Sequence, residues 1–111
     1  MRQLPLKIGM GLLLTGRQLT ASEAHAWGLV NAVVAAGDLL DQAHAWAREV
    51  LACAPLAVRA TKQAALQGMH LQLRDALYRN YDWVNRSRAS QDVLEGPRAF
   101  AEKRKPQWQG R

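Results

Sequence analysis

The amino-acid sequence predicts an all-α protein of five to seven short helices with at most one short strand. Several segments repeat apolar residues at helical spacing, and capping residues, glycine or proline stand at their ends. One β-branched run is too short for a helix and is the single candidate for a strand. The chain has 111 residues, 49% of them hydrophobic, which fits a folded protein of at most one domain.

The first helix is predicted from the apolar segment Leu4–Leu14, and Gly16 ends it. We expect this helix to be buried. Gly9 and Gly11 each disfavour a helix by about 1 kcal/mol relative to alanine, so they should mark close packing against a neighbour. An apolar helix at the very start of a chain suggests a fold cut from something larger.

A second, short helix is predicted from its capping residues. Thr20 and Glu23 have the spacing at which each side chain accepts a hydrogen bond from the other residue's backbone N–H. Gly28 supplies the left-handed residue that ends the helix. Leu29–Val34 follows, and its β-branched residues form either a strand or an extended connector.

The middle of the chain reads as two consecutive helices. Asp38 is the predicted N-cap of the first, and Pro55 both ends it and begins the second, which Gly68 closes. The first of the two presents one apolar face, formed by Leu39, Ala43, Trp46, Ala47, Val50 and Ala54.

One long helix is predicted from Leu73 onward, followed by a final helix. The long helix carries an apolar stripe formed by Leu77, Tyr81 and Val84. Ser90 is the predicted cap of the final helix, and Pro106 prevents its continuation.

The composition gives weak indications about partners and location. The net charge of +6 is spread over polar helix faces, so we expect no nucleic-acid partner. No apolar run approaches the ~20 residues that cross a bilayer, so we expect no membrane association. The single cysteine, Cys53, cannot form an intrachain disulfide, which favours a reducing, cytoplasmic compartment, and we expect its thiol to be buried.

Patterns that would indicate catalysis or metal binding are scarce. His25, His44 and His70 lie on separate predicted elements without the spacing of metal ligands, so we expect no metal site. No pair of carboxylates suggests acid–base chemistry, and we therefore predict no catalytic residue in this chain.

The closing stretch is the one candidate binding site. Phe100, Lys103 and Arg104 stand at positions i, i+3 and i+4, which on a helix places a ring and two cations on one face. Such a face suits a ligand with a nucleobase and phosphates, by stacking and charge-assisted hydrogen bonds. Alternatively, Phe100 belongs to the core and the cations complement a helix C-terminus. The spacing alone does not choose between these interpretations.

Three motifs in matching order resemble the enoyl-CoA hydratase/isomerase (crotonase) family. They are "LLLTGRQLTASEAHAWGLVNAVV", "APLAVRATKQAA" and "SQDVLEGPRAFAEKRKPQWQGR". The ending is most similar to the carnitinyl-CoA dehydratase (crotonobetainyl-CoA hydratase) branch of that family. The resemblance implies that residues 1–111 are the C-terminal helical part of a crotonase fold, which supports oligomerisation and contacts CoA.

The resemblance also implies what this part does and does not do. The family's catalytic glutamates and oxyanion hole lie in an N-terminal β/α core that residues 1–111 do not match, so we expect the chain to be inactive alone. Phe100 and Lys103 match family positions near the adenine and 3′-phosphate of coenzyme A; Arg104 and Lys105 either assist or are solvated.

The full-length parent is expected to hydrate or dehydrate a 2-enoyl-CoA in fatty acid or carnitine metabolism. Its substrate would be a CoA thioester, with no covalently bound cofactor. Self-association is expected as a trimer in the family, and as a dimer, trimer or swapped assembly here. The alternative function is a stand-alone basic helical module that binds nucleic acid or a protein partner.

Overall fold

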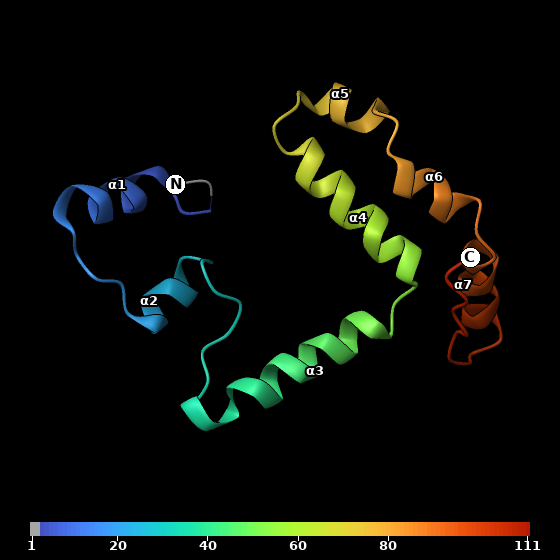
Figure 1. Ribbon diagram of the computed structural model, residues 1–111, viewed down its shortest axis with the longest axis horizontal. Coiled ribbons are helices and arrows are strands. Elements are labelled where there is room, and N and C mark those ends of the chain that lie inside the picture. The colour runs from blue at the N-terminus through green and yellow to red at the C-terminus, as the bar shows by residue number, and fades with distance from the viewer. Residues whose placement is uncertain (1–2) are drawn as a thin grey trace. The chain divides into compact units, whose positions relative to one another are not determined.

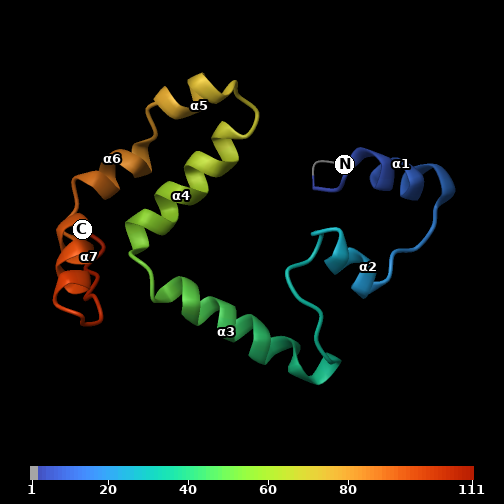
Figure 2. The same cartoon turned by 180° about the vertical axis from the view of Figure 1, so that it is seen from behind.

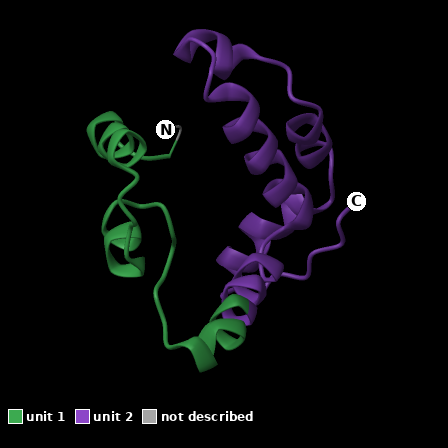
Figure 3. Ribbon diagram, turned by 60° about the vertical axis from the view of Figure 1, so that its left-hand side comes forward, with its two compact units in different colours: residues 1–43 green, residues 44–111 purple. Residues whose placement is uncertain are grey.

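The computed structural model describes residues 3–111, and within this range it contains seven α-helices, one 3₁₀ helix and no strand. The all-α class and the number of helices predicted from the sequence are therefore confirmed. Figures 1 and 2 show the chain from two opposite sides. It divides into two compact units, residues 1–43 and residues 44–111, which are coloured separately in Figure 3.

Helix α1 (Leu6–Thr15) is the predicted first helix. Gly16 ends it with a left-handed backbone (φ 64°) and donates its N–H to the carbonyl of Leu12 at 2.9 Å. Gly9 is buried, as its close-packing role requires, but Leu13 and Leu14 are 68% and 77% exposed. The prediction of the helix is confirmed, and the prediction that it is buried is wrong within this chain.

Helix α2 (Ala21–Ala26) has the predicted reciprocal cap. The Glu23 N–H donates to Thr20 Oγ1 at 3.2 Å, and the Thr20 N–H donates to Glu23 Oε2 at 3.0 Å. Gly28 ends the helix with φ 72°. The segment of residues 29–34 that follows pairs with no strand among residues 3–111, so it is a connector.

A 3₁₀ turn (η1, Ala36–Asp38) leads into helix α3 (Leu39–Leu51). Asp38 thus directly precedes the helix, as predicted, but it belongs to the preceding turn. Helix α3 ends three residues before Ala54, and the chain then enters helix α4 (Pro55–Gly68), where Pro55 occupies the first turn. Trp46 and Val50 on the predicted apolar face of α3 are 43% and 51% exposed.

The predicted long helix from Leu73 is wrong, because it is broken into α5 (Leu73–Tyr78) and α6 (Asp82–Arg88). The backbone is extended at Arg79 and Tyr81, with ψ angles of 137° and 122°. Tyr81 is buried, and its hydroxyl donates to the carbonyl of Ala76 at 3.0 Å. The break therefore turns Tyr81 inward.

The same break lets α6 fold back along α4. The Trp83 N–H at the start of α6 donates to Gln63 Oε1 on α4 at 2.9 Å. Helix α4 packs against both α5 and α6, and α6 packs against α7 (Asp92–Ala101).

The final helix, α7, begins differently from the prediction. Ser90 is buried and donates to the carbonyl of Ser87 at 2.7 Å, so it closes α6 and does not cap α7.

The described residues have almost no conventional hydrophobic core. The buried hydrophobic residues are Ala24, Ala60, Tyr81 and Ala99, and no large side chain among the described residues is fully buried. Close approach of small residues, not packing of large ones, therefore determines where the helices of the second unit meet.

Gly68 tests this close packing, because a Cβ there would lie 2.9 Å from the Tyr81 hydroxyl oxygen. We expect Gly68→Ala to lower the free energy of unfolding by about 1–2 kcal/mol, since overpacking outweighs the gain in helix propensity. In a Tyr81→Phe background the clash is removed, and the same change should be neutral or stabilising. Gly11→Ala, which meets nothing within 4 Å, is the control and should be stabilising. Denaturant unfolding gives the free energy of unfolding of Gly68→Ala, Tyr81→Phe, the double variant and Gly11→Ala.

Candidate functional site

Helix α7 and the tail that follows it form the candidate site, and the tail is held to the helix at two carboxylates. The first is Asp92, which is only 5% exposed. Its two oxygens accept the backbone N–H groups of Gln109 at 2.7 Å and Gly110 at 2.9 Å. The Gln91 N–H also donates to the carbonyl of Arg111 at 2.8 Å. The end of the chain is therefore fixed against the first turn of α7.

Glu95, one turn further along α7, is the second carboxylate. It accepts hydrogen bonds from both terminal nitrogens of Arg104, at 2.6 and 2.9 Å, and from the backbone N–H of Gln107 at 2.7 Å. The bonds from Arg104 and then from Gln107 lower the pKa of Glu95 from 4.5 to about 2. Glu95 thus stays charged over the whole physiological range and holds the middle of the tail.

Trp108 connects the tail to the start of the second unit. Its indole Nε1 donates to the carbonyl of Ala52 at 2.8 Å, just beyond the end of α3. Its ring lies against Gly96, where a Cβ would approach the ring carbon Cη2 to 3.4 Å. Trp108 thus lies close to the helix backbone at Gly96.

The end of α7 differs from the sequence prediction. The helix stops at Ala101, and Lys103 takes a left-handed conformation with φ 52°. The Lys103 N–H donates to the carbonyl of Phe100 at 3.2 Å and the Arg104 N–H to that of Ala99 at 3.0 Å, the bond pattern of a Schellman motif. Lys103 and Arg104 lie beyond the helix. The premise that Phe100, Lys103 and Arg104 share one helical face is wrong.

The three residues also differ in what they contact. Phe100 is 88% exposed, which excludes a place in the core of this chain. Arg104 is bound to Glu95 and, through Nε at 2.6 Å, to Glu102, and these bonds raise the pKa of its guanidinium. Lys103 is exposed and makes no ion pair with the residues that the structure describes. The predicted cluster therefore consists of a free ring, a free ammonium group and an arginine already bound.

Sequence reasoning missed the role of Asp92 and Glu95. A signal was present, because the two carboxylates stand three residues apart on the first turns of α7 and a glycine follows them. Their partners, however, are backbone N–H groups 12 to 18 residues further on, which leave no mark in the sequence. Cys53 also differs from the prediction of a buried thiol, because it is exposed.

The chain is similar in sequence to a family of known proteins. The profile of the family described as "Enoyl-CoA hydratase/isomerase" matches residues 1–111. A carnitinyl-CoA dehydratase from Salmonella arizonae is 42% identical over 114 residues, which cover 96% of this chain and 42% of that protein. A carnitinyl-CoA dehydratase from Proteus mirabilis is 40% identical, with 99% of this chain and 44% of that protein covered.

Solved structures of enoyl-CoA hydratases have a similar fold. A structure named as a short chain enoyl-CoA hydratase from Novosphingobium aromaticivorans has a TM-score of 0.92 and 43% identity, covering 100% of this chain and 44% of that one. An enoyl-CoA hydratase from Mycobacterium marinum has a TM-score of 0.90 and 39% identity, covering 99% and 44%. The chain spans less than half the length of these relatives.

Acid should release the tail from Glu95. Its folded-state pKa of about 2 lies below the ordinary 4.5, so its stabilising effect is complete above pH 4.5 and is lost as the pH falls through 2. Glu95→Gln should loosen the tail already at pH 7, with amide hydrogen exchange at Gln107 faster by about tenfold or more. Glu49→Gln, an exposed glutamate on α3, is the control. Equal exchange at Gln107 in all three proteins would contradict the role of Glu95.

Proposed function

Because this chain belongs to the enoyl-CoA hydratase/isomerase family, we propose that it is the C-terminal helical part of a protein that hydrates or dehydrates a 2-enoyl-CoA. Its roles are to contact the CoA group of the substrate and to support oligomerisation. The names of the relatives support this proposal, since they include carnitinyl-CoA dehydratases and enoyl-CoA hydratases. Residues 1–111 are proposed to act as one functional domain.

The hydration chemistry itself is assigned to the part of the parent protein that this chain does not span. The carboxylates with shifted pKa values, Glu23, Glu95 and Glu102, all have lowered values because arginine side chains donate to them. A carboxylate stabilised in this way is a poor general base, because its affinity for a proton is reduced. These glutamates are suited to holding structure, not to catalysis.

Phe100 and Lys103 are proposed to contact the adenine and the 3′-phosphate of coenzyme A. The observation that carries this proposal is the division of the cationic cluster: Arg104 is neutralised by two glutamates, whereas the ring of Phe100 and the ammonium group of Lys103 are free. The Lys103 N–H bond to the Phe100 carbonyl keeps the two residues within one turn. A ring and an ammonium group suit stacking on a base and a bond to phosphate.

The backbone of Lys103 supports a ligand role for its side chain. It is the one non-glycine residue with a positive φ among residues 3–111, whereas glycine takes the left-handed position after α1 and α2. Lysine there costs about 1 kcal/mol relative to a residue without Cβ. A site that keeps lysine despite this cost is expected to use its side chain.

Support for oligomerisation comes from the exposed apolar side chains. Leu6, Leu13 and Leu14 on α1 are at least 66% exposed, and so are Leu73, Leu77 and Tyr78 on α5. Soluble proteins rarely leave such residues clustered in water, so we propose that other parts of the parent or further copies of this chain cover them.

Substitution of Lys103 in the full-length protein tests the CoA contact. Lys103→Gly and Lys103→Ala should each raise KM for a CoA thioester about tenfold or more, because a charge-assisted bond to phosphate is lost. The value of kcat should change little, since the adenine end is bound alike in the ground and transition states. Lys103→Gly should also raise the free energy of unfolding by about 1 kcal/mol, as the left-handed strain is relieved.

The matched controls are a different substrate and a different lysine. With a pantetheine thioester, which lacks the 3′-phosphate, KM should be the same for the variants and the unchanged protein. Lys7→Ala, at an exposed lysine on α1, should leave both KM values unchanged. An unchanged ratio of the two KM values in the Lys103 variants would mean that this lysine only finishes α7.

The exposed apolar residues lead to a separate expectation for the 111-residue chain alone. At micromolar concentration it should sediment as a dimer, a trimer or a larger assembly, because association covers apolar surface that water would otherwise contact. Sedimentation velocity measures this, with dilution as the control for reversibility. A single monomeric species over the whole concentration range would count against the proposed interface.

A further inference from the structure

A second cationic site lies on α4 and α6, away from Phe100 and Lys103 in the sequence. The guanidinium carbons of Arg59 and Arg86 each lie 4.9 Å from the centre of the Trp83 ring. They are therefore at most twice that distance apart. Trp83 is half-buried, while both arginines are exposed. A cation–π contact with an indole restricts where a guanidinium group lies and leaves N–H donors free for another partner.

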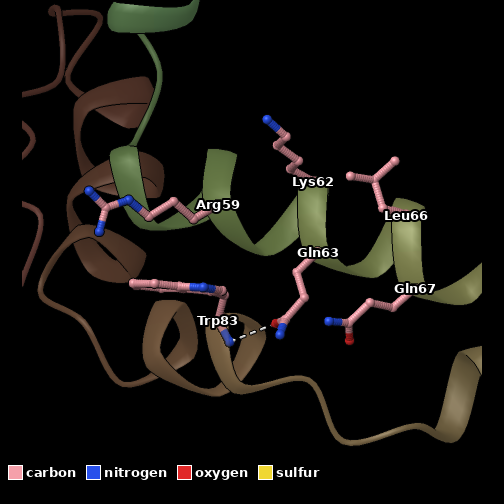
Figure 4. Close-up of a pocket in the computed structure, with 6 residues that line it drawn as sticks. All are labelled: Arg59, Lys62, Gln63, Leu66, Gln67 and Trp83. Carbon is pink, nitrogen blue, oxygen red and sulfur yellow. Dashed lines mark hydrogen bonds between the residues drawn. The ribbon is translucent and has the colours of Figure 1, made fainter.

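A hollow of about 450 Å³ lies beside the Trp83 ring. It is lined by Arg59, Lys62, Gln63, Leu66, Gln67 and Trp83, which Figure 4 shows projecting from α4 and α6. A neighbouring hollow of about 420 Å³ shares Arg59 and Trp83 and adds Arg86 and Arg111. No aspartate or glutamate lines either one.

The cations of this surface lack acidic partners. The ion pairs among residues 3–111 use Arg17, Arg98 and Arg104, and none uses Arg59, Lys62 or Arg86. The guanidinium groups of Arg59 and Arg86 lie at one ring, and Lys62 lines the same hollow as Arg59. These positive charges repel each other, and an anion bound beside them would relieve that repulsion.

Hydrogen-bond donors at the site are partly pre-arranged. Gln63 Oε1 accepts a hydrogen bond from the backbone N–H of Trp83 at 2.9 Å, drawn as a dashed line in Figure 4, so the amide NH₂ of Gln63 is left as a donor. The guanidinium groups occupy the space over the indole, which disfavours stacking of a nucleobase there. The remaining side chains offer mainly N–H donors and positive charge, and no carboxylate side chain lines either hollow.

We propose that the surface formed by Arg59, Lys62, Trp83 and Arg86 binds the phosphate group of a small phosphorylated molecule. A monocarboxylate would neutralise one of the three cations, whereas a phosphate monoester or a pyrophosphate carries enough charge and oxygen acceptors for several donors. A hollow of about 450 Å³ has room for the rest of a small phosphorylated molecule beside its phosphate group. The inference is independent of the proposed CoA contact, because the two sites share no residue.

Titration of inorganic pyrophosphate into the 111-residue chain tests the site by isothermal calorimetry. Arg59→Gln and Arg86→Gln should each weaken binding about tenfold, because each removes a charge-assisted donor. Arg88→Gln is the matched control: it makes the same change on the same helix, but Arg88 lines neither hollow, and the affinity should change less than about twofold. Acetate should bind much more weakly than pyrophosphate.

Two further variants keep the test decisive. Arg86→Lys retains the charge, so it should preserve folding and still weaken binding by losing the planar fork of donors. Lys7→Ala, at an exposed lysine on α1, should bind pyrophosphate as the unchanged chain does, which separates this site from a general attraction to positive charge. No detectable binding of pyrophosphate, equal losses in Arg88→Gln and Arg86→Gln, or equal affinity for acetate would each overturn the proposal.

Discussion

The attachment of the C-terminal tail to α7 is the interaction on which the rest of the second unit depends. Asp92 and Glu95 hold the tail by three backbone N–H groups, and Glu95 also binds the arginine that follows the helix. A buried carboxylate is costly unless donors satisfy it, so Asp92 is stable only while the tail is in place. The tail in turn brings Trp108 to Ala52 and Gly110 to Pro55, which joins it to the α3–α4 junction.

This fold is determined by caps, charge-assisted bonds and small residues rather than by a large apolar core. Gly68 lets Tyr81 approach, and three of the four buried hydrophobic residues are alanines. Apolar side chains on α1 and α5 remain in water. Hydrophobic burial is the main favourable term in folding, and these side chains do not contribute to it within this chain, which supports the proposal that other parts of the parent or further copies of the chain cover them.

The parts of the fold that could be predicted from the sequence are those that depend on neighbouring residues. The Thr20–Glu23 cap, the end of α2 at Gly28 and the start of α4 at Pro55 follow from local chemistry within one turn. The break before α6 could not be predicted, because the apolar spacing continues through it. It depends on the burial of Tyr81 against Gly68, a contact between residues 13 positions apart that periodicity does not record.

In the candidate site, too, sequence spacing does not predict the contacts of two adjacent cations, Lys103 and Arg104. Spacing treats Lys103 and Arg104 as equivalent charges on one helical face, but α7 ends at Ala101 and the left-handed turn at Lys103 separates them. Arg104 is directed to Glu95, nine residues earlier, because its planar fork matches a carboxylate. Lysine lacks that fork and stays free. The end of the helix thus makes one cation structural and leaves the other free, beside an exposed Phe100, where we propose that it contacts CoA.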